Sequence, residues 1–210
     1  MARIVVFGAN GGVGRRLVEL ALAQSHWVTA AVRNPAKVAM AHERLQIVAC
    51  NVLDPITIEP AIAGQDAVLC ALGSDDRGPT TLYSTGARNI VQQMQAHHVR
   101  RIVFLSNFGV LGEMSRGLHQ ALLLFLASRV LRHTLADHRR ALDEIRRRAP
   151  DWIIVRPLPM SDGPRTGVYR VAIDDLPAHG ARISRADVAD FMLRQITSDD
   201  YLHRLPSIAY

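Results

Sequence analysis

The sequence predicts an α/β protein with a doubly wound, mostly parallel sheet and helices on both faces. Two features of its 210 residues predict this fold class. Short apolar runs alternate with segments of helical spacing, and no hairpin signal joins one run to the next. Strand–helix–strand repeats of this kind form right-handed crossovers between parallel strands. We predict a single domain over 1–210, with a small C-terminal substrate lobe to which 156–210 contribute.

Each strand is predicted from a short run of apolar residues, the pattern of a strand buried on both faces. The six runs are 3–7, 27–32, 45–49, 66–71, 101–105 and 152–155, and 168–173 is a further candidate. Apolar spacing predicts helices at 13–24, 80–97 and 185–197, the last entered from Ser184. Asn34-Pro35 and Asp54-Pro55 are each expected to open a short helix.

A glycine-rich loop joins the first strand to the first helix. Gly8, Gly11 and Gly14 have the spacing Gly-x-x-Gly-x-x-Gly. The first allows a tight turn, the middle ones allow close approach of a pyrophosphate, and the last allows the helix to pack on the strand. A helix N-terminus then offers free amides to phosphate. With its flanking strand and helix, the loop predicts dinucleotide binding by a Rossmann-like domain.

The residue after the second strand indicates which dinucleotide binds. A domain that selects NAD usually places an acidic residue here to hold the ribose diol. This chain has Arg33, 19 residues past Gly14, and Lys37 follows one helical turn later. Both side chains suit a 2′-phosphate, and the arginine can bind it with two hydrogen bonds. We therefore predict NADP(H) as the cofactor, the alternative being that Arg33 only solvates a surface turn.

Several segments together resemble one known family, the atypical short-chain dehydrogenases/reductases with an NmrA-like NAD(P)-binding domain. Within it the chain is most similar to the flavin reductases, also called biliverdin-IXβ reductases. The likeness covers most of the chain and is poorest at 109–135. The matching segments are Phe7 to Ala9, Gly11 to Gly14, Val32-Arg33, Ala63 to Val68, Pro79 to Thr81, Gly86 to Val91, Thr166 to Tyr169 and Ile183 to Leu193.

The resemblance implies a role for each matching position. It implies that the pyrophosphate lies on Gly8, Asn10, Gly11, Gly12, Val13 and Gly14, and the 2′-phosphate on Arg33 and Lys37. Asn51 and Val52 would contact the adenine, although aspartate often stands where Asn51 does. The ribose would lie along Leu72, Gly73 and Ser74. Ser106, the candidate catalytic residue, would lie beside the nicotinamide, with Pro157 and Leu158 on its other side.

Two departures from related enzymes concern the chemistry. Pro159 stands where the flavin reductases have a histidine near the substrate, with Arg156 as a neighbouring polar alternative. The Tyr-x-x-x-Lys pair, in which lysine lowers the pKa of a catalytic tyrosine, is absent because Lys37 is the only lysine. The reaction therefore needs little acid–base help, or the protein binds NADP(H) without turnover.

Three local features each allow more than one interpretation. Ser106 either donates a hydrogen bond to a substrate or nicotinamide, or satisfies the backbone at a strand end. Asp137-His138 could supply a proton, but a helix cap followed by a solvated histidine is favoured. The leucine-rich stretch 118–126 is a core helix, a lid over a planar substrate or a self-association face.

Composition and charge exclude several classes. The net charge of +6 comes from arginines in helical patterns or beside acidic residues, which indicates solvated faces, not nucleic-acid binding. No apolar run is long enough to span a membrane. Cys50 and Cys70 fit buried positions in a reducing, cytoplasmic protein. The histidines lack metal-ligand spacing, so no metal site is expected.

The leading hypothesis is therefore a cytoplasmic NADPH-dependent reductase, monomeric or homodimeric. Its small-molecule partner would be a conjugated acceptor: a flavin, a biliverdin-like tetrapyrrole or a quinone. The alternative is a non-catalytic NADP(H)-sensing regulatory protein of the NmrA-like type. A sugar-nucleotide epimerase-like enzyme is disfavoured by the missing Tyr-x-x-x-Lys pair and the short C-terminal part.

Overall fold

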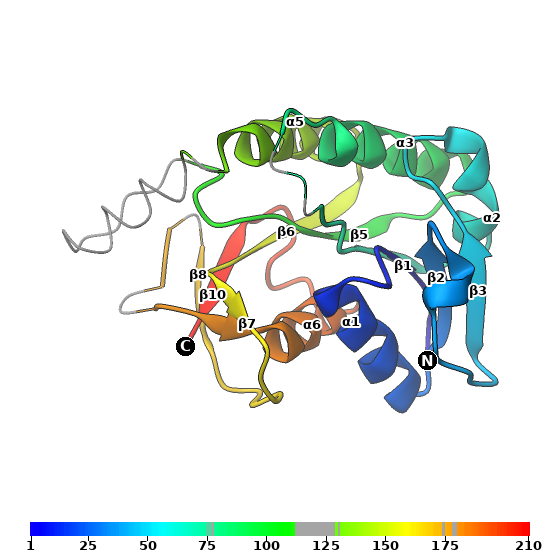
Figure 1. The fold of residues 1–210 in the computed structure, drawn as a ribbon, viewed down its shortest axis with the longest axis horizontal. Helices are drawn as coiled ribbons and strands as arrows, with labels where there is room; N and C mark the ends of the chain where they lie inside the picture. Colours follow the sequence, from blue (N-terminus) through cyan, green and yellow to red (C-terminus); the bar gives the residue numbers. More distant parts are fainter. Residues whose placement is uncertain (75, 77, 112–128, 130, 174, 178–179) are drawn as a thin grey trace.

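The computed structural model describes residues 1–210 except 75, 77, 112–128, 130, 174, 178 and 179. An eight-stranded sheet runs through it in the order β3-β2-β1-β4-β5-β6-β10-β8 (Figure 1). Every ladder in this sheet is parallel except the one between β10 and β8. The strands are β1 (Arg3–Phe7), β2 (Trp27–Val32), β3 (Leu45–Ala49), β4 (Ala67–Cys70), β5 (Arg101–Leu105), β6 (Asp151–Pro157), β8 (Arg170–Ile173) and β10 (Pro206–Ala209).

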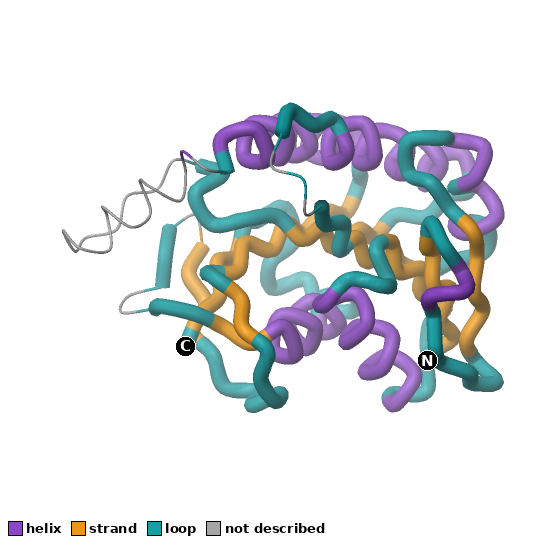
Figure 2. Tube along the Cα trace, viewed as in Figure 1, coloured by secondary structure: helices purple, strands orange, loops and turns teal. Residues whose placement is uncertain are grey.

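Helices cover both faces of the sheet, and Figure 2 shows the strands as the middle layer between them. Helices α2 (Glu59–Ile62), α3 (Leu82–Ala96) and α5 (Arg132–Arg148) lie on one face, and α1 (Gly12–Ala23) and α6 (Arg185–Arg194) on the other. Short 3-10 turns η1 (Pro35–Lys37) and η2 (Pro55–Thr57) follow β2 and β3. A separate parallel pair, β7 (Met160–Ser161) with β9 (Ile183–Ser184), lies before α6.

The first strand shows why the chain forms two cores. Val5 and Phe7 pack with the α3 and α5 face, whereas Ile4 and Val6 pack with the α1 and α6 face. All four side chains are fully buried. Successive side chains of a strand point to opposite faces, so an unbroken apolar run fits only a sheet covered on both sides.

The predicted fold class is confirmed, as are the six strand runs and the helix starts at Asn34, Asp54 and Ser184, whose side chains cap their helices. Strand β10, which lies between β6 and β8, is not predicted from the sequence. Its residues Pro206 to Ala209 include a proline and a serine and so lack a strand pattern. The leucine-rich stretch 118–126 lies outside the described residues.

Candidate functional site

The glycine-rich loop makes its turn with contacts that exclude larger residues. Gly8 has a φ of 77°, and a Cβ there would lie 2.4 Å from the carbonyl oxygen of Ala71. A Cβ on Gly14 would lie 2.1 Å from the Gly8 carbonyl oxygen. The Gly11 amide donates to that same oxygen at 2.9 Å. Gly8 and Gly14 are therefore required by the turn and by the approach of helix to strand.

Helix α1 begins directly above this loop and has an open N-terminus. Its N-cap is Gly11, no side chain caps it, and its first turn contains no acidic residue. Most helix N-termini gain a Ser, Thr, Asp or Asn cap, because their first amides have no partner within the helix. These uncapped amides, together with the positive end of the helix dipole, fit the negatively charged pyrophosphate of a dinucleotide.

Two cations stand beside the loop at the end of β2. The side chains of Arg33 and Lys37 are exposed and have no hydrogen-bond or ion-pair partner within the described part of the chain. The intervening Asn34 accepts from the Ala36 amide at 3.1 Å and so fixes the turn between them. Asn10 of the glycine loop donates to the Asn34 carbonyl at 3.4 Å. The Asn10–Asn34 hydrogen bond thus holds the glycine loop to the segment that carries both cations.

The residues predicted to hold the adenosine part follow β3 and β4. Asn51 is exposed, whereas the Val52 side chain is buried against Gly86 of α3. Asn89 donates to the Val52 carbonyl at 2.9 Å, which holds this turn to α3. Leu72 is half-buried, Gly73 and Ser74 are exposed, and a Cβ on Gly73 would meet no atom within 4 Å.

Ser106 lies at the end of β5, next to the end of β6. Its amide donates to the Val155 carbonyl at 2.8 Å, and the Phe108 amide donates to the Pro157 carbonyl at 3.4 Å. Leu158 follows Pro157 and is buried. The structure therefore brings Ser106, Pro157 and Leu158 together at the carboxyl edge of the sheet, the edge from which the glycine loop also starts.

His138 of α5 is the partner of Ser106 that sequence reasoning missed. Its Nδ1 lies 3.3 Å from Ser106 Oγ, and both residues are 2% exposed. The ring stacks on Tyr83 with centroids 3.9 Å apart and meets Phe104 edge-on at 6.2 Å. Burial lowers the pKa of His138 to about 4, although the Asp137 charge opposes this shift. The imidazole is therefore neutral at pH 7.

The favoured interpretation of Asp137-His138, a helix cap followed by a solvated histidine, is wrong. Both residues lie in the middle of α5 and are buried. The Asp137 carboxylate accepts hydrogen bonds from the Tyr83 and Ser84 amides, the Ser84 hydroxyl and Arg140. It thus satisfies the first turn of α3 from a neighbouring helix. No local pattern reveals this contact, because Asp137 and Ser84 are 53 residues apart.

Arg156, the polar alternative to the missing histidine, has its side chain turned away from the solvent. It is fully buried in β6, and its Nε and Nη2 donate to the Leu205 carbonyl at 3.1 and 2.9 Å. Pro159 is exposed, and its carbonyl accepts from the Ile183 amide at 3.2 Å. Arg156 therefore ties β6 to the segment before β10, and it does not replace the histidine.

The C-terminal lobe is held together by a buried carboxylate, Asp187 of α6. It accepts from the amides of Thr166 and Gly167 at 2.9 and 2.8 Å, and from the Tyr210 hydroxyl at 2.6 Å. Ser184 and Thr166 hydroxyls complete its partners. Burial raises the pKa of Asp187, but the hydrogen bonds outweigh burial and lower it overall.

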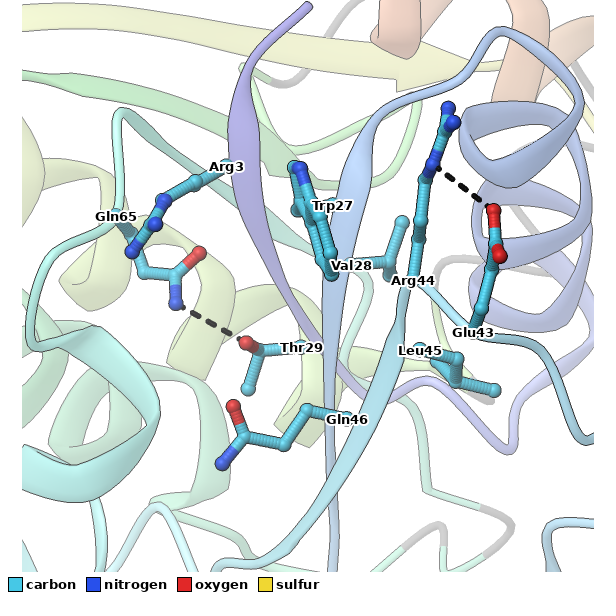
Figure 3. Close-up of a pocket in the computed structure, with 9 residues that line it drawn as sticks. All are labelled: Arg3, Trp27, Val28, Thr29, Glu43, Arg44, Leu45, Gln46 and Gln65. Atoms are coloured by element: carbon cyan, nitrogen blue, oxygen red, sulfur yellow. Dashed lines mark hydrogen bonds and ion pairs between the residues drawn. The ribbon is translucent and has the colours of Figure 1, made fainter.

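A cavity at the amino ends of the strands is separate from this site. It has a volume of about 300 Å³ and lies where β1, β2 and β3 begin. Figure 3 shows Trp27 between Arg3 and Arg44, and Gln65 donating to Thr29 at 3.0 Å. The glycine loop leaves the other end of β1, so this cavity is not part of the candidate cofactor site.

The geometry described above defines a nucleotide-binding α/β domain, and comparison with known families agrees. The sequence model of a family described as NAD(P)H-binding matches residues 8–199. The chain belongs to that family, and its cofactor is a nicotinamide dinucleotide. Within the described residues, no helix combines the length and apolar character needed to cross a membrane.

The proteins that this chain resembles include both sequence relatives and solved structures. The photosystem II assembly factor Ycf39 of Synechocystis sp. is 32% identical over 108 residues, which are half of this chain and 33% of that protein. A Rossmann-fold NAD(P)-binding family protein from Shigella flexneri has a TM-score of 0.77 and 25% identity, covering 99% of this chain and 93% of its own. The anaerobillin reductase ChuY of Escherichia coli O157:H7 has a TM-score of 0.80 at 19% identity, covering 99% and 96%. At that identity the likeness to ChuY shows the fold alone.

Proposed function

We propose that this protein is an NADPH-dependent reductase that passes hydride to a conjugated acceptor: a flavin, a biliverdin-like tetrapyrrole or a quinone. The observation that carries the proposal is the contact between Ser106 and His138 at the sheet edge that also bears the glycine loop. The family described as NAD(P)H-binding, to which residues 8–199 match, supports the nicotinamide cofactor that such a reaction needs.

Arg33 and Lys37 select NADPH in this proposal. Both are exposed beside the loop, so they bind a 2′-phosphate without first breaking an ion pair. Bidentate guanidinium–phosphate bonds are among the stronger charge-assisted hydrogen bonds. No acidic residue stands at this position to favour a free ribose diol.

Bound NADPH would supply the hydride, and the protein's residues would position the acceptor. The neutral His138 ring fixes the orientation of the Ser106 hydroxyl, which donates to the acceptor when Nδ1 carries the ring proton. With a pKa of about 4, only about one His138 ring in a thousand is protonated at pH 7. The proton that balances the hydride therefore comes from solvent, and most of the acceleration comes from proximity and orientation.

Acceptor reduction is tested by following NADPH oxidation with FMN, riboflavin, menadione and biliverdin as separate acceptors. We expect turnover with at least one acceptor, and a fall in kcat of roughly 10- to 100-fold in Ser106→Ala. Ser198→Ala is the matched control, because the Ser198 hydroxyl bonds to Asp200 and its carbonyl to Arg101, at the other end of β5. Oxidation by none of the acceptors would count against a reductase.

Cofactor preference is tested separately with Arg33→Gln. We expect the ratio of NADPH to NADH affinity to fall by about tenfold or more, since a charge-assisted bond to the 2′-phosphate is lost. Arg44→Gln removes the same charge at the opposite edge of the sheet and should leave the ratio unchanged. An unchanged ratio in Arg33→Gln would refute the assignment of that residue.

A second candidate is a non-catalytic NADP(H) sensor. The burial of both Ser106 and His138 favours it, because groups with 2% exposure do not reach a substrate without movement. The related protein from Synechocystis is a photosystem II assembly factor. Tight NADP⁺ binding with no acceptor turnover, together with a co-purifying protein, would support the sensor over the reductase.

A further inference from the structure

Arg185 of the C-terminal lobe lies across the glycine-rich loop. It is the first residue of α6, which packs beside α1 on the same face of the sheet. A Cβ on Gly12 would lie 2.6 Å from Arg185 Cδ and 2.8 Å from its Nε. For Gly8, Gly11 and Gly14 the nearest obstacle is backbone. Gly12 alone among these four makes room for a side chain, and that side chain is a cation.

The guanidinium of Arg185 has a weakly held partner. Its Nη1 lies 2.9 Å from Asp162 Oδ1, in the turn after β7. The Asp162 side chain is 90% exposed, and that of Arg185 is 32% exposed. Ion pairs this close to solvent contribute little to stability, because water and salt screen them. A more highly charged ligand on the loop can therefore replace Asp162.

We propose that Arg185 binds the cofactor's diphosphate from the lobe side and exchanges Asp162 for phosphate oxygens when NADP(H) binds. This inference rests on the proposed cofactor, and it adds a phosphate-binding residue outside the glycine motif. A guanidinium presents several N–H donors in a planar fork that matches phosphate oxygens. The uncapped amides of α1 and Arg185 then hold the diphosphate from two elements that are far apart in sequence.

The exchange connects the cofactor to the acceptor side of the site. Asp162 follows β7, and Arg185 follows β9, the strand paired with β7. Loss of the Asp162 contact on binding frees the turn at 162 relative to α6. Because Asp162 competes with the diphosphate for Arg185, removing its charge should tighten cofactor binding, whereas removing Arg185 should weaken it.

Isothermal titration calorimetry with NADP⁺ and with 2′-AMP, which lacks the diphosphate, tests this competition. We expect Arg185→Gln to weaken NADP⁺ binding by roughly 10- to 50-fold, in line with one charged hydrogen bond, and to change 2′-AMP binding by less than about twofold. Asp162→Asn should tighten NADP⁺ binding by about two- to fivefold. The double variant should match Arg185→Gln, because without Arg185 there is no guanidinium for which residue 162 and the diphosphate can compete.

Two further variants complete the experiment. Arg182→Gln removes the same charge from an exposed position three residues earlier and should leave both affinities unchanged. Arg185→Lys keeps the charge and an aliphatic stem against Gly12, so it should fold and bind NADP⁺ more tightly than Arg185→Gln. Wild-type affinity for NADP⁺ in Arg185→Gln, or weaker binding in Asp162→Asn, would overturn the inference and leave the proposed function standing. Failure of the wild-type protein to bind NADP⁺ would overturn both.

Discussion

The two sides of the candidate site differ in the exposure and the hydrogen bonding of their polar groups. On the cofactor side, residues 8–14 and 33–37, the α1 amides lack a side-chain cap and the Arg33 and Lys37 side chains are exposed. On the reaction side, Ser106, Asp137 and His138 are buried and bonded to one another or to α3. The polar groups of the first side are open to a charged ligand, whereas those of the second side are hydrogen-bonded within the protein.

This difference fits the different requirements of binding phosphate and of orienting an acceptor. Phosphate groups bring their own charge, so a surface of open donors and cations suffices to hold them. Orienting an acceptor needs side chains fixed by packing, because a small misplacement of a reacting group costs much of the rate. We therefore expect substitutions on the cofactor side to change ligand affinity, and those on the reaction side to change stability as well.

Gly8→Ala should be an exception on the cofactor side, because it should lower stability. We expect this loss of stability to be the largest of those predicted here. The new Cβ would meet the Ala71 carbonyl at 2.4 Å, at a φ of 77° that non-glycine residues avoid. Overpacking and left-handed strain together should lower the free energy of unfolding by about 3–4 kcal/mol. Urea unfolding followed by circular dichroism measures the loss.

Two other glycines separate the two causes. Gly109 has a φ of 69°, and a Cβ there would meet no atom within 4 Å, so Gly109→Ala should cost only about 1–2 kcal/mol of strain. Gly73 has neither feature, and Gly73→Ala should change stability by less than about 0.5 kcal/mol. Equal losses in all three variants would contradict this explanation of the loop.

Asp137→Asn should cost about 2–3 kcal/mol, which is the next largest effect. The buried carboxylate accepts from two amides and a hydroxyl of α3, and an amide side chain cannot replace all of these bonds. Asp143→Asn, at an exposed position of the same helix, is the control and should stay within about 0.5 kcal/mol. A loss of similar size in both variants would mean that helix charge, rather than the contact with α3, matters.

Much of the cofactor side could be predicted because its residues follow strands directly. Gly8 to Gly14 continue from β1, and Arg33 continues from β2, so recognising the strand places the residue. Parallel strands bring these ends to one edge of the sheet without any knowledge of side-chain packing. What the local pattern does not reveal is that a side chain at Gly12 would meet Arg185 of α6.

The reaction side could not be predicted in the same way. Ser106 and His138 are 32 residues apart, and their contact depends on how α5 rotates on the sheet. Aspartate and histidine in a helix rich in arginine are usually exposed, so composition favoured the wrong interpretation. Strand β10 was missed because a proline and a serine obscure its pattern, although all four of its residues are buried.

The pH dependence of stability should reveal that His138 is buried in its neutral form. Burial lowers its pKa from 6.5 to about 4, so the unfolded chain binds the proton more readily between these values. Stability should therefore fall as pH drops below 6.5, by about 2 kcal/mol between pH 6.5 and 5. His26, whose pKa is lowered by burial and by the N-terminal charge, contributes with the same sign.

Comparing the wild-type protein with His138→Gln isolates the part due to His138. The free energies of unfolding at pH 6.5 and pH 5 should differ less in the variant than in the wild-type protein. His26 contributes equally to the pH dependence of the two proteins. Parallel pH profiles for the two proteins would show that His138 does not remain neutral in the fold.

Tyr210→Phe should produce the smallest of these effects, about 1 kcal/mol, by removing a hydroxyl that donates to Asp187 and accepts from the Ser184 amide. Tyr201→Phe is the control, since the Tyr201 ring packs on Phe191. Hydrogen bonds hold the pKa of Asp187 below its ordinary 3.8 despite burial, so their contribution is present above that pH and is lost in acid. The difference between Tyr210→Phe and wild type should therefore shrink as pH falls below about 4. A constant difference down to pH 3 would indicate that the hydroxyl stabilises the lobe through its hydrogen bond from the Ser184 amide, and not through the charge of Asp187.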